Sequence, residues 1–224
     1  MSDRSLIRFG GLAGILLALS SWLAVVVYYA LVPAAQRLPI ADAGVYLASL
    51  AQSSTGSQLF NGLYALIAFW SFAGTVAVYY RLRQHGEAWA LFATLIGSMT
   101  AILTIVGSLQ QLANLRYLAA LSSTLPDFAA AALAAPAPLN PVNIVSAGLV
   151  APWFLVISLL MLKADFPRLL AYLGLIAFAD LTVGFLAALF GLAPLAILAA
   201  LVAGAVGGPV FWLWLGFILR RQPA

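Results

Sequence analysis

The stretch LLAYLGLIAFADLTVGFLAALFGLA, residues 169–193, decides the fold class because it is apolar for long enough to cross a bilayer. At ~1.5 Å per residue, a helix of this length spans a hydrocarbon core of about 30 Å. A carboxylic acid, Asp180, stands near the centre of the stretch. A charged side chain at that depth costs about 2.5 kcal/mol or more on insertion scales. The surroundings of Asp180 must therefore offset that cost.

The spacing of small residues predicts which way Asp180 points. One stripe of the helix carries, at intervals of three and four, Gly174, Ala177, Asp180, Gly184, Ala187 and Gly191. Bulky residues occupy the other faces, namely Leu175, Phe178, Leu181, Phe185 and Leu189. Because small residues let helices approach closely, we expect the stripe to face the bundle and the bulky residues to face lipid. Asp180 should then point inward, uncharged, and donate a hydrogen bond to a neighbouring helix.

Composition places the whole chain in the membrane class. Of its 224 residues, 65% are hydrophobic and 7% are charged, whereas a soluble domain has roughly 25% charged residues. The chain has no cysteine, and its one histidine, His85, lies between two apolar segments. We therefore expect no metal and no cofactor. The net charge of +4 comes from basic residues at the ends of apolar segments, so we expect no nucleic-acid partner.

Six apolar segments predict a single all-α transmembrane domain over residues 1–224. The predicted spans cover residues 10–32, 59–80, 88–113, 143–162, 169–193 and 195–219. Longer loops follow at 33–58 and 114–142, and the sequence ADAGVYLASLAQ, residues 41–52, can form a short helix in the first. Helix can also continue past Arg116, because no helix breaker precedes Pro126.

Basic residues orient the six spans. Eight of the ten fall on one predicted side: Arg4, Arg8, Arg81, Arg83, Lys163, Arg168, Arg220 and Arg221. Only Arg37 and Arg116 fall on the other side. Because cytoplasmic ends carry the excess of Lys and Arg, this bias predicts that both termini are cytoplasmic and that the long loops lie outside.

Polar and helix-breaking residues recur near the middle of the spans. The candidate intramembrane site comprises Asp180, Ser20, Ser21, Ser71, Ser98, Thr100, Thr104, Gly207, Gly208 and Pro209. Transporters place substrate sites at this depth, often beside interrupted helices. Close packing and hydrogen bonding between helices explain the same serines and threonines equally simply. The sequence leaves both interpretations open.

The sixth span is interrupted by GGP, residues 207–209. Proline has no N–H, so Pro209 leaves the carbonyl of Ala205 without its helical donor. This break is either a hinge beside a cavity or a kink fitted to its neighbours. Trp212 and Trp214 follow it close to the predicted cytoplasmic interface, where an aromatic belt explains them without a ligand.

Catalytic motifs are absent from the sequence. It contains no HExxH, GxSxG or phosphate-binding loop. His85 and Glu87 share a short polar turn with no third group to orient them, so we interpret them as solvated charge. The sequence thus gives no support for an enzyme.

Three stretches carry a resemblance to a known group of proteins. They are RFGGLAGILLALSSWL at residues 8–23, FPRLLAYLGLIA at 166–177 and PVFWLWLGFILRRQ at 209–222. With them the chain resembles uncharacterised bacterial multi-pass inner-membrane proteins grouped as a domain of unknown function. The resemblance implies a bacterial inner-membrane location and no particular catalytic or binding residue.

Two functions follow from these observations as hypotheses. The first is a non-enzymatic accessory protein or complex subunit, surrounded by the lipid bilayer, that associates with a membrane protein partner or with further copies of itself. The alternative is a small proton-linked carrier or sensor with a midplane pocket around Asp180. A membrane enzyme acting on a lipid is a third class, for which the sequence offers no catalytic group.

Overall fold

The computed structural model describes residues 3–37, 42–124 and 141–221, and all regular structure within them is helical. The long elements are α1 (Asp3–Ala30), α3 (Thr55–Leu82), α4 (Glu87–Thr124), α6 (Pro141–Lys163) and α7 (Arg168–Leu189). A last rod consists of α8 (Ala193–Val202), the π-helical segment η3 (Ala203–Gly207) and α9 (Gly208–Arg221). Six of the resulting stretches are long and apolar enough to cross a membrane. The chain is therefore an all-α multi-pass membrane protein, as predicted.

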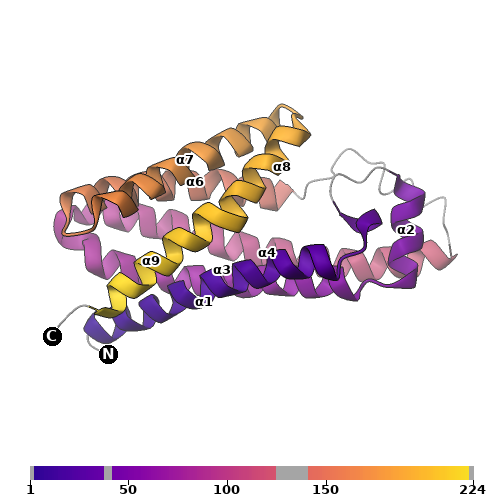
Figure 1. Cartoon of the computed structure of the whole chain (residues 1–224), viewed down its shortest axis with the longest axis horizontal. Coiled ribbons are helices and arrows are strands. Elements are labelled where there is room, and N and C mark those ends of the chain that lie inside the picture. The colour runs from indigo at the N-terminus through magenta and orange to yellow at the C-terminus, as the bar shows by residue number, and fades with distance from the viewer. Residues whose placement is uncertain (1–2, 38–41, 125–140, 222–224) are drawn as a thin grey trace.

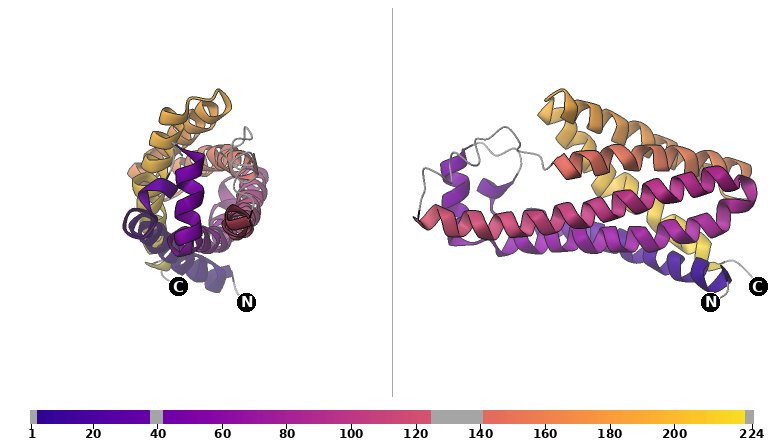
Figure 2. Two further views of the ribbon diagram at one scale, coloured as in Figure 1. Left: turned by 90° about the vertical axis from the view of Figure 1, so that its right-hand side faces the viewer. Right: turned by 180° about the vertical axis from the view of Figure 1, so that it is seen from behind.

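Both chain ends lie at one end of an elongated bundle (Figure 1). The turns between α3 and α4 and between α6 and α7 lie at that same end, and α2 (Ala43–Gln52) lies at the opposite end (Figures 1 and 2). We call the first the terminal end and the second the α2 end. This arrangement gathers the eight basic residues predicted to share a side at the terminal end, since each lies near a helix boundary there.

Aromatic rings form the core of the half nearer the terminal end. The rings of Trp153 and Trp212 stack with their centroids 5.2 Å apart, and Phe154 and Phe211 complete the cluster. The prediction that Trp212 belongs to an interfacial belt is wrong, because Trp212 is only 7% exposed. Gly74 makes room for its ring, since a Cβ there would come within 2.6 Å of it.

The α2 end carries a small helical cap outside the predicted spans. The short helix predicted at 41–52 is confirmed as α2, whose first turn is capped by the Asp42 carboxylate accepting from the Val45 N–H at 2.8 Å. Tyr46, Leu47 and Leu50 of α2 pack against Leu115 of α4. This docking explains why α2 lies across the end of the bundle in Figure 1.

Helix α4 is longer than its predicted span. It runs unbroken for 38 residues to Thr124, so the predicted continuation past Arg116 is confirmed and the predicted loop start at residue 114 is wrong. Most of the remaining predicted loop, residues 125–140, lies outside the described residues. Apolar residues between 115 and 121 pack against α2, which explains why the helix continues beyond its predicted span.

Glycines set the close contacts around α1. A Cβ at Gly216 of α9 would lie 2.6 Å from the Gly11 carbonyl, and one at Gly10 would collide with the Ala77 side chain of α3. Helix α1 thus packs tightly against both α3 and α9. Helix α8, by contrast, packs against α7, and the last rod crosses the bundle diagonally to reach α1 (Figure 1).

Candidate functional site

The small stripe of α7 faces two different helices. A Cβ at Gly174 would collide with Ser158 Oγ of α6, whereas a Cβ at Gly184 would lie 2.9 Å from the Ala199 Cβ of α8. Gly174, Ala177 and Ala187 are buried, as predicted. Gly184 is half-buried, and Gly191, with φ at 71°, lies exposed in the turn before α8. The stripe therefore faces the bundle except at its last residue.

The bulky residues of α7 do not all face away from the bundle, although the sequence predicts that they do. Phe178 and Leu181 pack against the core, and the Phe185 ring lies where a Cβ on Gly148 would come within 2.6 Å of it. The prediction that these residues face away from the bundle is wrong for these three, whereas Leu175 is half-buried and Leu189 is 56% exposed on the surface of the bundle. The reason is that α7 packs against α6 on one side and the last rod on the other, which covers a wider arc than one neighbour would.

Asp180 lies beside the start of η3. Gly174 is opposite Phe211 as well as Ser158, and Gly184 is opposite Ala199, so the antiparallel register brings Asp180 alongside the first residues of η3. Helix α7 packs against η3 in agreement with this register. The midplane carboxylic acid and the interruption of the sixth span are thus neighbours.

The environment of Asp180 differs in one respect from the prediction. The residue is half-buried, at the edge of the inward face, with Oδ2 enclosed. Within the described residues, no hydrogen-bond partner reaches Oδ2, so the expected bond to a neighbouring helix is missing there. A polar group inside a membrane without a bond is costly. Within α7, Asp180 Oδ2 is the one buried side-chain oxygen or nitrogen without a hydrogen-bond partner among the described residues.

The interruption itself is a π-helical turn. The N–H of Gly208 bonds the Ala203 carbonyl five residues earlier, and Gly207 and Gly208 are half-buried while Pro209 is buried. The Ala205 carbonyl, predicted to lose its helical donor, accepts a hydrogen bond from the Trp22 Nε1 of α1 at 3.0 Å. The freed carbonyl thus turns to a neighbouring helix.

Three of the six hydroxyl groups of the candidate site are bonded within their own helices. Ser21 donates to Leu17, Ser71 to Ala68 and Thr104 to Thr100, all carbonyls, at 2.8–2.9 Å. Such internal bonds favour the packing interpretation for these residues. Two further members, Ser20 and Ser98, are buried and half-buried respectively, and the Thr100 hydroxyl oxygen is buried without a partner in the described part of the chain.

The candidate residues do not all meet at one place. Ser98, Thr100 and Thr104 belong to α4, which packs against α3 and α6, whereas α7 packs against α6, α8, η3 and α9. Helix α6 therefore stands between the α4 hydroxyls and Asp180. The structure brings Asp180 together with the segment before Gly208, and not with the α4 residues.

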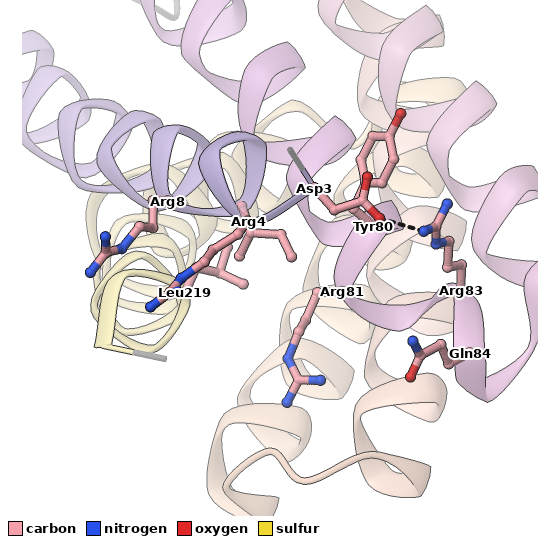
Figure 3. Close-up of a pocket in the computed structure, with 9 residues that line it drawn as sticks. Asp3, Arg4, Arg8, Tyr80, Arg81, Arg83, Gln84 and Leu219 are labelled. Carbon is pink, nitrogen blue, oxygen red and sulfur yellow. Dashed lines mark hydrogen bonds and ion pairs between the residues drawn. The ribbon is translucent and has the colours of Figure 1, made fainter. Parts of the chain in front are cut away.

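A charged cavity at the terminal end was missed by the sequence interpretation, which treated its arginines as topology signals only. It is open, has a volume of about 310 Å³ and does not include Asp180. Figure 3 shows the side chains around it, contributed by α1, α3, α9 and the 3₁₀ turn η2 (Arg83–His85) that follows α3. The pair Arg4 and Arg8, one helical turn apart, was the available signal, because residues at i and i+4 share a face.

Comparison with protein-family models, with curated proteins and with solved structures finds no match to this chain. The class of protein rests on the helices themselves, which define a multi-pass integral membrane protein. Two polar features of the described residues are candidate binding sites: the unbonded carboxylic acid beside η3 and the arginine cavity.

Proposed function

We propose that this protein is a non-enzymatic accessory subunit of a membrane complex, located in a bacterial inner membrane with both termini cytoplasmic. The excess of basic residues at the terminal end supports that orientation, since eight of the ten lie there. The resemblance of the first, fifth and sixth spans to bacterial inner-membrane proteins supports the choice of membrane.

The single observation that carries the proposal is the unbonded Asp180 carboxyl. It lies inside a span, at the edge of the inward face, and Oδ2 has no partner among the described residues. Interhelical hydrogen bonds are the usual way to offset such a group in a membrane. Because Oδ2 itself is enclosed while the residue is half-buried, rotation of the carboxyl about its last side-chain bond would exchange the two oxygens. A helix from another subunit, packed against this edge of α7, would then supply the missing donor.

The outer face of α7 has the shape that such a contact needs. Its exposed residues recur at intervals of three and four: Leu169, Tyr172, Ile176, Ala179, Val183 and Leu186. This spacing matches the seam along which two helices pack. Ala179 lies at its centre, next to Asp180, and its small side chain allows close approach of a second backbone. The docked helix would then reach the carboxyl from the side.

The test compares three variants of the full chain solubilised in mild detergent, with the mass of the assembly measured by native mass spectrometry. Asp180→Leu should release the partner or the second copy, and Asp180→Asn should retain part of it, because an amide still forms hydrogen bonds. Thr182→Val is the matched control, since the Thr182 hydroxyl is already bonded to the Phe178 carbonyl. An unchanged assembly mass in Asp180→Leu contradicts the proposal.

The alternative, a proton-linked carrier or sensor, is favoured by a different observation. The π-helical turn η3 lies beside Asp180, and π turns occur frequently at functional sites. In this alternative Asp180 takes up a proton while the sixth span bends at Gly207–Pro209. Proton uptake by protein reconstituted in vesicles tests it: Asp180→Asn should abolish uptake, and equal uptake by the variant and the unmodified protein excludes this function.

A further inference from the structure

The cavity at the terminal end concentrates positive charge. Four arginines surround it, Arg4 and Arg8 from α1, Arg81 from α3 and Arg83 from η2, against one acid, Asp3. Figure 3 shows Arg4 and Arg8 on one side of the cavity and Arg81 and Arg83 on the other. The excess is three positive charges in an open space of about 310 Å³.

One of the four arginines is already engaged. Arg83 forms an ion pair with Asp3, with Nη2 2.5 Å from Oδ2, and its guanidinium lies 5.1 Å from the Tyr80 ring centroid. Arg81 stands over the Phe166 ring at 5.3 Å, yet its Nε is buried with no partner in the described part of the chain. Arg81 also lines the cavity, so an anion there would meet its positive charge.

Arg4 and Arg8 lie one turn apart on α1, and no ion pair with either is seen within residues 3–37, 42–124 and 141–221. Guanidinium groups in such an arrangement match the oxygens of a phosphate, to which each can donate two hydrogen bonds. The charge and the donor geometry thus fit a phosphate group.

The same face of α1 becomes apolar above the two arginines. Leu12 is 40% exposed, and Leu19 and Leu23 are each 51% exposed, so they form a lipid-facing track in line with Arg4 and Arg8. Ile7 and Leu219 form the apolar wall of the cavity itself. A phospholipid can contact both parts of this surface, its phosphate the arginines and its acyl chains the leucines of α1. A free phosphate can contact only the arginines.

We infer that the cavity binds the phosphate of an anionic phospholipid, with Arg4, Arg8 and Arg81 as donors and the exposed leucines of α1 against the acyl chains. The inference is independent of Asp180 and of the proposed association through α7. The arginines at the terminal end would then both bind a specific lipid and orient the chain in the membrane.

The experiment measures lipid bound to the intact full chain by native mass spectrometry, from mixed micelles with equal amounts of phosphatidylglycerol and phosphatidylcholine. Basic residues near a membrane surface strengthen binding to anionic lipid, and the contributions of two of them multiply in the affinity. The preference for phosphatidylglycerol should therefore fall about thirty-fold in R4Q/R8Q. R4K/R8K keeps both charges and should retain most of the preference. The matched control is R168Q/R221Q, which removes two exposed charges at the same end but outside the cavity.

Three results would overturn the inference. Equal losses in R4Q/R8Q and R168Q/R221Q would show attraction by general surface charge. No preference for phosphatidylglycerol in the unmodified protein would exclude an anionic lipid. Binding of inorganic phosphate without such a preference would identify a soluble anion as the ligand instead. Selective loss in R4Q/R8Q, with a retained preference in R4K/R8K, supports the lipid site.

Discussion

Trp22 on α1 donates its indole N–H to the carbonyl of Ala205, 3.0 Å away in the π-helical turn of the last rod. Pro209, four residues after Ala205, has no N–H to offer, so the indole replaces the missing helical donor. The bond holds α1 against the turn that lies beside Asp180. It also explains how an irregular helix persists inside a membrane, where every carbonyl needs a donor.

Trp22→Phe should destabilise the protein by about 1 kcal/mol, because it leaves the Ala205 carbonyl unbonded while keeping an aromatic ring in place. Unfolding in a detergent titration measures the change. Trp89→Phe serves as the control, since Trp89 is 61% exposed, and should leave the free energy of unfolding unchanged. Equal stabilities of the two variants would show that the indole bond contributes nothing.

Gly174→Ala should destabilise the contact between α7 and α6 by about 1–3 kcal/mol, the usual cost of overpacking. The added methyl group would collide with Ser158 Oγ and lie 3.1 Å from the Phe211 ring. Thermal unfolding in detergent measures the loss. Gly62→Ala is the control, because a Cβ there meets nothing within 4 Å, and it should be neutral or stabilising.

Adding Ser158→Gly to Gly174→Ala should recover much of that loss. Ser158 is fully buried and its hydroxyl has no partner in the described residues, so removing it sacrifices no hydrogen bond there. The double variant moves the small residue from one helix to the other and restores the space. If the double variant is no more stable than Gly174→Ala, the collision with Ser158 is not the cause of the loss.

Gln36→Leu should loosen the cap at the α2 end. The Gln36 side chain donates to Ser49 Oγ at 2.9 Å and to the Ser53 carbonyl at 2.8 Å, and it accepts from the Ser57 hydroxyl at 2.7 Å. Its loss should lower the free energy needed to unfold this region by about 1–3 kcal/mol, because buried hydrogen-bond partners are left unbonded. Faster proteolysis and hydrogen exchange of α2 would report it, and Gln52→Leu, at an exposed site, should change neither.

Tyr46 should make the cap sensitive to alkaline pH. Burial raises the pKa of Tyr46 above its ordinary value of 10.0. Because the folded state holds this proton more tightly than the unfolded state, the stabilisation is complete below about pH 10 and falls as the pH rises towards the folded-state pKa. The unfolding midpoint from about pH 8 to about pH 11 should therefore decline less in Tyr46→Phe than in the unmodified protein. Identical declines would contradict the prediction.

The sequence predicts the membrane class and the number of spans because both depend on the length and hydropathy of single segments. It also predicts α2, from the short stretch ADAGVYLASLAQ, and the freed Ala205 carbonyl, from the proline after it. Each of these features is local. One segment contains all the information that the prediction needs.

The errors concern contacts between distant segments. Trp212 is core because Gly74 of α3 leaves space for its ring, and Phe178 faces inward because α7 has neighbours on two sides. In a membrane both lipid and core are apolar, so hydropathy cannot distinguish the two sides of a helix. The arginine cavity was missed because it forms only where α1, α3, η2 and α9 meet, which no single segment predicts.

The length of α4 affects how a tilt at one end moves the other end. Its 38 residues make a continuous rod of ~57 Å, of which about 30 Å can lie in hydrocarbon. Helices of this kind curve only gently, so a tilt of about 5° around the terminal end displaces the last turns by about 5 Å. The docked α2 would be carried along. A small tilt at the terminal end would in this way become a larger displacement at the far tip of α4.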